Sequence, residues 1–218
     1  MSYAEAVLLD FDDTITCSYR TGVEFFREIA RNTGIRVPSE REIRKYWGYT
    51  IEDIAKNVWD GDYGRFVEAY ERRQARVVPF HDGAEDALRL LSSHLPMGII
   101  TSRTGEDIRK AFDKLGIDPM LYFMWIFGCD EVECRKPDPR VFNGVLRELE
   151  GMGIGKAGTI YTGDHLFDYY AARDAGLGFY GVTTGVHSRE EFTEAGLKDE
   201  KIIDSLSELP GKLGIDEL

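Results

Sequence analysis

The sequence predicts a three-layer α/β protein with a parallel sheet and an inserted all-helical domain. Short apolar runs recur along the chain, and segments of helical periodicity lie between most of them. Continuous rather than alternating hydrophobicity is typical of parallel strands covered on both faces, and strands that alternate with helices predict a parallel sheet. A third observation, one long stretch with helical patterns alone, predicts the insertion.

Five apolar runs are the predicted strands, and the last of those named here gives the weakest signal. Each has four or five residues, which is the length of a buried strand rather than of a helix. The runs are "AVLL" (Ala6–Leu9), "MGII" (Met97–Ile100), "GTIYT" (Gly158–Thr162), "GFYGV" (Gly178–Val182) and "WIFG" (Trp125–Gly128).

Four helices are predicted among these strands. Capping residues, capping-box spacing, a proline at the first helical position and a closing glycine indicate where they start and stop. The signals are Asp82 with Glu85 for the first helix, Thr104 and Gly116 for the second, Asp138, Pro139 and Gly151 for the third, and Gly176 at the end of the fourth, "FDYYAARDAG".

Residues 16–80 contain helical patterns and no convincing strand. A stretch of about 65 residues is too long for a plain crossover between neighbouring strands, which indicates an inserted domain. The helical signals are an apolar periodicity over Val23–Asn32, helix-start spacings at Ser39–Glu42 and Thr50–Asp53, and a longer helix over Asp62–Val77.

The chain length supports one core domain that carries a smaller insertion. The sequence has 218 residues, whereas single domains commonly have 100 to 150. We therefore predict a catalytic core of residues 1–15 and 81–218, and a helical domain of residues 16–80.

The charge balance argues against nucleic acid as a partner, and the start of the chain and the cysteine content indicate the compartment. With 39 acidic and 27 basic residues the net charge is −12, whereas nucleic-acid binding usually requires a basic surface. The start "MSYAEAVLLD" resembles neither a signal peptide nor a membrane span. The three cysteines are few and unpatterned, which favours a reducing compartment. We expect a cytoplasmic protein that binds neither nucleic acid nor membrane.

Carboxylates follow the first and fourth of these strands in chain order. In open α/β sheets ligands bind outside the carboxyl ends of the strands. The first strand is followed by Asp10 and Asp12, which share one side if the strand continues through them. Asp164 and Asp168 follow a later strand at the same edge. Each pair by itself is also compatible with simple helix capping, because aspartate is a favoured N-cap.

Two such clusters at one sheet edge favour a bound cation over capping. Carboxylate oxygens without histidine or cysteine partners are the ligands that Mg²⁺ prefers. Other groups at this edge suit a phosphorylated ligand. Lys136 could offset negative charge, and Thr101 with the following turn could hold a phosphate at a helix N-terminus. Ser102 and Arg103 directly follow Thr101, and Arg103 is either a substrate contact or a surface residue.

These residues resemble the four motifs of the haloacid dehalogenase (HAD) superfamily. "DFDDT" matches the first motif, "IITS" the second, "RKPDP" the third, and "GDHLFD" with "AARDAG" the fourth. The motifs occur in order over residues 10–176. The helical insertion between the first two resembles the C1-type cap of phosphoglycolate phosphatase-like members. The resemblance implies a Rossmann-like catalytic core with a helical cap domain.

The resemblance also implies a role for each matched residue. Asp10 would be the nucleophile that forms an aspartyl-phosphate, and Asp12 the general acid and then the general base. Asp10, the main-chain carbonyl of Asp12, Asp164 and, in support, Asp168 would hold Mg²⁺. Thr101 and Lys136 would hold phosphoryl oxygens. Independently of the resemblance, Ser102 and Arg103 are our candidate substrate contacts, because they directly follow Thr101. We expect Asp13 to face away from this group and to be structural.

The cap is expected to select the substrate. "KYWGYT" resembles the family's specificity loop, so Lys45, Trp47 and Tyr49 are candidate contacts, although packing explains Trp47 equally well. We predict a Mg²⁺-dependent phosphatase of a small phosphorylated metabolite, phosphoglycolate-like or a sugar phosphate, in a monomer or homodimer. The alternatives are a phosphosugar mutase with the same residues, or a non-catalytic member that binds a regulatory partner.

Overall fold

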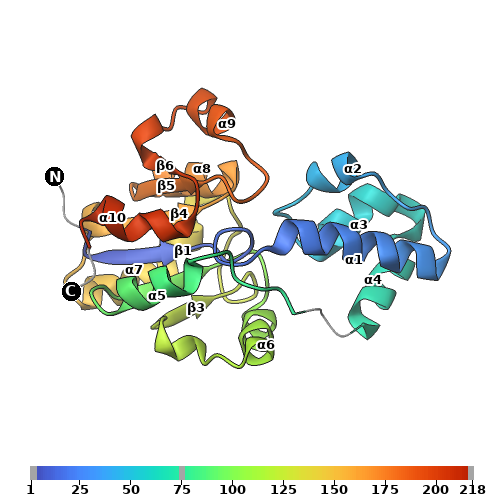
Figure 1. The fold of residues 1–218 in the computed structure, drawn as a ribbon, viewed down its shortest axis with the longest axis horizontal. Coiled ribbons are helices and arrows are strands. Elements are labelled where there is room, and N and C mark those ends of the chain that lie inside the picture. Colours follow the sequence, from blue (N-terminus) through green and yellow to red (C-terminus); the bar gives the residue numbers. More distant parts are fainter. Residues whose placement is uncertain (1–3, 74–76, 216–218) are drawn as a thin grey trace. The chain divides into compact units, whose positions relative to one another are not determined.

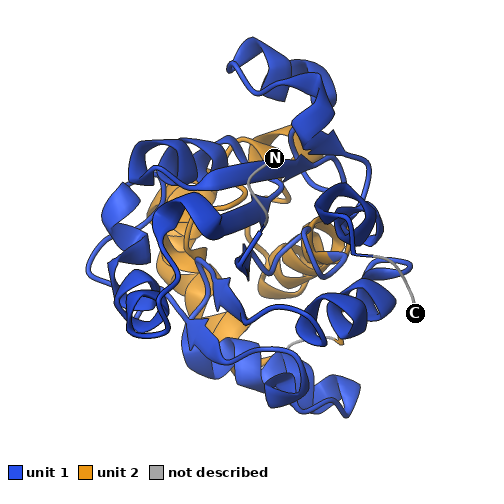
Figure 2. Cartoon of the chain, turned by 90° about the vertical axis from the view of Figure 1, so that its left-hand side faces the viewer, with its two compact units in different colours: residues 1–17, 79–218 blue, residues 18–78 orange. Residues whose placement is uncertain are grey.

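The chain forms two compact units in a computed structural model that describes residues 4–73 and 77–215. One unit comprises residues 1–17 and 79–218, and the other comprises residues 18–78 (Figure 2). The structure thus divides the chain after residues 17 and 78, whereas the sequence predicted the boundaries after residues 15 and 80.

The first unit is built on a six-stranded parallel sheet (Figure 1). Its strand order is β3-β2-β1-β4-β5-β6, and every neighbouring pair is parallel. The five predicted strands are confirmed, and β6 was missed because two residues are too few to show a pattern. The strands are β1 (Ala6–Leu9), β2 (Met97–Ile100), β3 (Trp125–Phe127), β4 (Thr159–Gly163), β5 (Gly178–Val182) and β6 (Ile202–Ile203).

Both faces of the sheet are buried, which confirms the three-layer α/β class. Along β1, Val7 and Leu9 belong to one apolar cluster, and Ala6 and Leu8 belong to the other. Alternate side chains of a strand point to opposite faces, so each cluster covers one face. The first cluster includes residues of α5 (Ala84–Ser92), α6 (Gly105–Leu115) and α10 (Leu209–Leu213), and the second includes residues of α7 (Asn143–Gly151), α8 (Leu166–Ala175) and α9 (Arg189–Glu194).

Helices α6 and α8 follow the sequence signals closely. Thr104 caps α6 with its side chain, and Gly116 ends that helix in the left-handed conformation. Gly176 does the same for α8. Left-handed backbone is open to glycine at little cost, which is why a glycine marks the stop so reliably.

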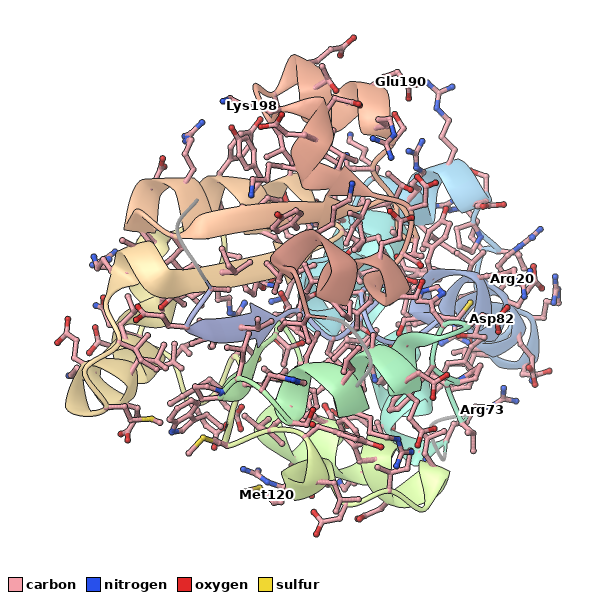
Figure 3. All side chains as sticks on the ribbon, turned by 60° about the vertical axis from the view of Figure 1, so that its left-hand side comes forward. Arg20, Arg73, Asp82, Met120, Glu190 and Lys198 are labelled. Atoms are coloured by element: carbon pink, nitrogen blue, oxygen red, sulfur yellow. The ribbon has the colours of Figure 1, made fainter. Side chains whose placement is uncertain are left out.

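The predicted start of α5 at Asp82 is wrong. Gly83, with a φ of +73°, is the N-cap, and no side chain caps the helix. A turn closed by the bond from the Ala84 N–H to the His81 carbonyl (3.0 Å) precedes the helix, so Asp82 lies in the turn and is exposed (Figure 3). The capping-box spacing was therefore coincidental.

The third predicted helix is split in two. Asp138 accepts a bond from the Arg140 N–H, as an N-cap should, but the turn that follows is the 3₁₀ helix η3 (Pro139–Phe142). Helix α7 begins only at Asn143, and Gly151 is its last residue rather than the residue beyond it. The remaining 3₁₀ turns of this unit are η2 (Pro119–Leu121), η4 (Lys156–Gly158), η5 (Asp199–Lys201) and η6 (Leu206–Glu208).

The second unit consists of helices alone in its described residues, as expected. The predicted caps Ser39 and Thr50 are confirmed, and Ser39 forms a full capping box with Glu42. The last predicted helix is too long, because α4 ends at Arg72 and residues 74–76 lie outside the described residues. The elements are α1 (Ser18–Thr33), α2 (Glu40–Arg44), α3 (Ile51–Trp59), η1 (Asp60–Asp62) and α4 (Tyr63–Arg72).

An aromatic cluster forms the centre of the helical unit. Trp59 stacks on Phe66 at 3.8 Å between ring centroids, and Phe26 contacts both rings. Trp47 is buried and lies 5.8 Å from Phe26 and 5.2 Å from Tyr19 by ring centroids. Trp47 therefore packs inside the helical unit.

Two features bear on the environment of the protein. Over residues 4–73 and 77–215, no helix combines the length and the apolar composition that crossing a bilayer requires. Cys17, Cys129 and Cys134 are free thiols, in keeping with their irregular spacing. The cytoplasmic location stays a prediction.

Packing around Trp47 yields a first test. A Cβ at Gly22 of α1 would overlap the indole ring, whereas a Cβ at Gly64 of α4 would meet nothing within 4 Å. Overpacking costs about 1–3 kcal/mol, so Gly22→Ala should lower the free energy of unfolding by about that amount. Gly64→Ala, also in a helix, should leave it unchanged or raise it slightly. Urea unfolding followed by tryptophan fluorescence measures both, and equal stabilities would contradict this packing.

Candidate active site

The candidate site lies where the strand order reverses direction along the chain. β1 is flanked by β2 on one side and by β4 on the other, and such a switch point is where open α/β sheets bind ligands. Leu9 pairs with Thr162, and the Asp10 N–H donates to the Thr162 carbonyl at 2.9 Å. This register brings the residues that follow β1 and β4 to the same place.

A buried lysine is the centre of the site. Lys136 Nζ donates to Asp10 Oδ1 at 2.8 Å, to Asp168 Oδ1 at 2.6 Å and to the Tyr161 hydroxyl at 3.1 Å. The side chains of Lys136, Asp10 and Asp168 are all less than a tenth exposed. Burial disfavours the lysine charge, but the two carboxylates outweigh it and raise the pKa of Lys136 well above its ordinary value.

Three buried carboxylates share the space beside this lysine. Asp10, Asp164 and Asp168 each offer an oxygen, and these oxygens lie within 4.8 Å of one another. Burial, only partly offset by Lys136, raises the pKa of Asp10 to about 7. Burial and the neighbouring aspartates also raise the pKa of Asp164 well above its ordinary value. One lysine thus does not balance the charge of all three.

The donor set fits a small divalent cation. Hard oxygen ligands without nitrogen or sulfur partners are what Mg²⁺ or Ca²⁺ binds, and a cation would relieve the repulsion among the ionised carboxylates. Asp12 is outside this group of carboxylates, so any contribution from its main-chain carbonyl stays a prediction.

Asp12 is held by an arginine. Arg103 Nε donates to Asp12 Oδ2 at 2.7 Å and Nη2 donates to Oδ1 at 2.6 Å, which makes a bidentate pair. Strand β1 ends at Leu9, so strand alternation does not extend to Asp12 and does not decide where its side chain points. Arg103 also donates its N–H to the Thr101 hydroxyl at 3.2 Å, and thereby joins the first two motifs. Arg103 therefore forms an ion pair with Asp12 in this structure.

We expected Asp13 to face away from the cluster, and this prediction is wrong. Asp13 is buried, has a φ of +58°, and its charge is the largest electrostatic contribution of any neighbour to the raised pKa of Asp164. Its carbonyl accepts a bond from the Thr184 hydroxyl. The left-handed conformation, which aspartate tolerates better than most residues, turns the chain so that Asp13 points inward.

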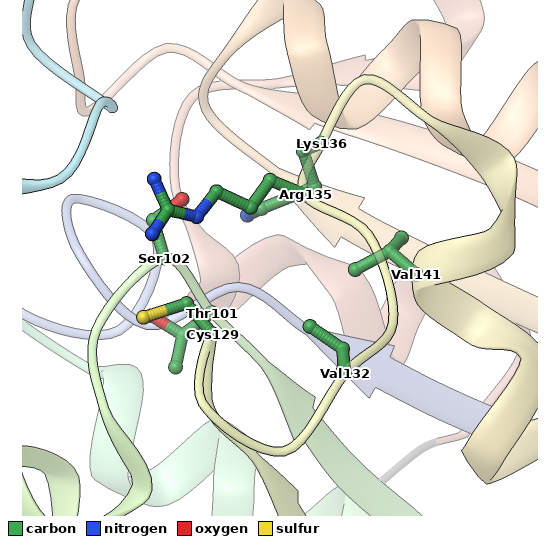
Figure 4. A pocket seen from close by; sticks show the side chains of 7 residues that line it. All are labelled: Thr101, Ser102, Cys129, Val132, Arg135, Lys136 and Val141. Atoms are coloured by element: carbon green, nitrogen blue, oxygen red, sulfur yellow. The ribbon is translucent and has the colours of Figure 1, made fainter.

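Thr101, Ser102 and Lys136 line one pocket (Figure 4). Arg135, which the sequence did not single out as a site residue, also lines this pocket. The other lining residues are Cys129, Val132 and Val141. The predicted substrate contacts Lys45 and Tyr49 lie in the helical unit, where Lys45 is the C-cap of α2 and Tyr49 is 42% exposed.

A family model described as haloacid dehalogenase-like hydrolase matches residues 7–182. The chain belongs to this family. The four motifs therefore indicated the right family, and the chain is an enzyme, a HAD-type hydrolase.

Two curated relatives agree with that assignment, and a solved structure shows the same fold. Phosphoglycolate phosphatase of Thiobacillus denitrificans is 25% identical, over 94% of this chain and 93% of the relative. Phosphoglycolate phosphatase of Escherichia coli K12 is 26% identical, over 82% of this chain and 62% of the relative. A haloacid dehalogenase-like family hydrolase of Streptococcus pneumoniae has a TM-score of 0.77 at 19% identity, over 97% of this chain and 99% of that one, and shows the same fold.

Two further parts of the site were missed by sequence reasoning. Tyr161 lies inside β4, and its hydroxyl is within 3.0 Å of both Asp168 Oδ1 and the Ile100 carbonyl. A tyrosine within an apolar run carries no signal of such a role. Thr184 and Gly185 follow β5, and inspecting the residues after that strand, as after the others, would have drawn attention to them.

The buried lysine gives a second test. Lys136→Met would leave Asp10 and Asp168 buried without their cation, and such a loss costs about 3–5 kcal/mol. Lys110→Met is the matched control, because it removes the exposed ion pair between Lys110 and Glu106 on α6, which at 2.6 Å is as short as the pair between Lys136 and Asp168. Loss of this exposed pair should change stability little. Urea unfolding at about pH 8 in chelator compares the two variants. A Lys136→Met protein as stable as Lys110→Met would argue against this electrostatic picture.

Proposed function

We propose that the protein is a Mg²⁺-dependent phosphatase that hydrolyses a small phosphorylated metabolite through an aspartyl-phosphate on Asp10. The observation that carries the proposal is the buried group of Asp10, Asp164, Asp168 and Lys136 at the sheet switch point. An active site that transfers a phosphoryl group needs a nucleophile, a cation and a means to move a proton, and this edge of the sheet offers a residue for each.

The nucleophile is Asp10. Its Oδ1 accepts a bond from Lys136, which fixes the carboxylate at the end of β1. In the first step a carboxylate oxygen attacks phosphorus and the ester P–O bond breaks, leaving the phosphoryl group on Asp10. In the second step water attacks phosphorus, the acyl–phosphate P–O bond breaks, and inorganic phosphate leaves. Covalent catalysis divides one difficult displacement into two easier ones.

Asp12 moves the protons in both steps. It gives a proton to the departing alcohol oxygen, and in the second step it takes one from the attacking water. The bidentate pair with Arg103 fixes the position of its carboxylate. Thr101, Ser102 and Lys136, which line one pocket, are proposed to hold phosphoryl oxygens, whereas a direct substrate contact by Arg103 would require it to leave Asp12.

The proposed metal ligands are Asp10, the main-chain carbonyl of Asp12, and Asp164, with Asp168 in support. A bound Mg²⁺ supplies positive charge that allows the anionic Asp10 to approach an anionic phosphoryl group. Lys136 supplies a second, permanent positive charge at the same carboxylate.

The substrate class rests on the relatives. The two curated relatives described above are named phosphoglycolate phosphatases, so a phosphoglycolate-like compound or a sugar phosphate is the proposed substrate. The helical unit is proposed to act as a cap that chooses the substrate, with Lys45 and Tyr49 as contacts. A small metabolite is consistent with the net charge of −12, because it requires only a local positive site.

Phosphate release tests the chemistry. Asp10→Asn should lower kcat for a panel of phosphorylated metabolites by at least about a thousandfold, since it removes the nucleophile. The exposed Asp82→Asn should leave kcat unchanged, and chelator should abolish release by the wild-type protein. Isomerisation of a sugar phosphate without release would instead favour the mutase. No turnover of any kind would favour a binding role.

The pH dependence of metal stabilisation tests the cation. The folded-state pKa of Asp10 is raised from 3.8 to about 7, so without metal its contribution to stability is lost as pH rises through that window. Mg²⁺ binds the ionised carboxylates, so the rise in Tm that it causes should be larger at about pH 8 than at about pH 5.5. Asp164→Asn should reduce this rise at about pH 8. An unchanged Tm in saturating Mg²⁺ at both pH values would contradict the metal assignment.

A further inference from the structure

The loop that follows β5 packs directly on Asp164. The Val186 N–H donates to Asp164 Oδ2 at 3.3 Å. Gly185 lies so close that a Cβ at this position would overlap Oδ2, Cγ and Cβ of the same aspartate. Its φ is not in the left-handed region, so the close approach of the side chain, and not the backbone conformation, requires glycine here.

The start of the same loop is held by hydrogen bonds to remote segments. The Thr183 N–H donates to the Ile203 carbonyl of β6 at 3.1 Å, and the Thr184 hydroxyl donates to the Asp13 carbonyl. Beyond the loop, Ser188 forms a capping box with Glu191 at the start of α9. The bonds of Thr183 and Thr184 prevent the start of the loop from moving away from Asp164 without breaking tertiary contacts.

The loop therefore restricts the position of the Asp164 side chain. One oxygen is engaged by a backbone N–H, while an oxygen of Asp164 remains within 4.8 Å of ligand atoms on Asp10 and Asp168. An aspartate side chain otherwise samples several staggered rotamers, and only some of them would direct its carboxylate toward the other two. Groups that orient a metal ligand commonly contribute 10- to 100-fold to metal affinity.

We propose that the segment Thr184–Val186 is a positioning element for Asp164, and that glycine at position 185 is required for that role. The inference rests on the proposed metal site and adds to it a loop outside the four motifs. The Thr184 bond links this loop to the Asp13 carbonyl, three residues after Asp10, so the loop also ties two carboxylate-bearing segments together.

Magnesium binding by metal-free protein tests the proposal without reference to turnover. Isothermal titration with MgCl₂ should show that Gly185→Ala raises the Kd by about 10- to 100-fold, because the new methyl group displaces either the loop or the Asp164 carboxylate. Gly155→Ala is the matched control, since a Cβ at that loop glycine meets nothing within 4 Å and its φ is −92°. Its Kd should equal that of the wild type.

A second pair of variants applies if Gly185→Ala does not fold, as judged by its Tm without metal. Thr184→Val keeps the shape of the side chain but removes the bond to Asp13, and should weaken Mg²⁺ binding, whereas Thr184→Ser should restore it. If Gly185→Ala folds and binds Mg²⁺ with wild-type affinity, the inference is overturned and the proposed function stays intact. If Gly185→Ala does not fold, wild-type Mg²⁺ affinity in Thr184→Val has the same consequence. Absence of Mg²⁺ binding by the wild type would overturn the metal site and the inference together.

Discussion

The burial of three carboxylates around one lysine is the constraint on which the active site depends. Asp10 and Asp164 follow the neighbouring strands β1 and β4, and Asp168 lies in the first turn of α8. Lys136 reaches Asp10 and Asp168. Buried charge is tolerated only when it is paired and hydrogen-bonded, so the surrounding residues have to supply partners. The metal that the site is proposed to bind would complete this neutralisation.

Much of the surrounding structure meets that demand. Tyr161 places its hydroxyl between Lys136 and Asp168, and the His165 N–H donates to Asp168 Oδ2 at 3.0 Å. Two glycines, Gly163 and Gly185, leave room for the carboxylates, since a Cβ on either would overlap an aspartate. The carboxylates thus come from the segments that follow β1 and β4, and the bonds and spaces that orient them come from β4 and from the loop after β5.

The sequence allowed most of the fold to be predicted, because continuous apolar runs and terminal glycines are local signals. Five of the six strands and the caps Thr104, Ser39 and Thr50 follow from such signals. The errors occurred where local signals compete. Asp82 had the spacing of a cap but lies in a turn, and the Pro139 helix begins as a 3₁₀ turn. At β6, two residues were too few to show any pattern.

What the sequence by itself determined is the set of strand-end residues, from Asp10 to Asp168, and the family to which they belong. Only the tertiary structure decided which of them share space. It placed Arg103 on Asp12, turned Asp13 toward Asp164 and brought Gly185 against the same carboxylate. Spacing along the chain fixes which edge of the sheet a residue reaches. Distances at that edge depend on strand register and loop packing between segments remote in sequence, and a single sequence carries no direct signal of either.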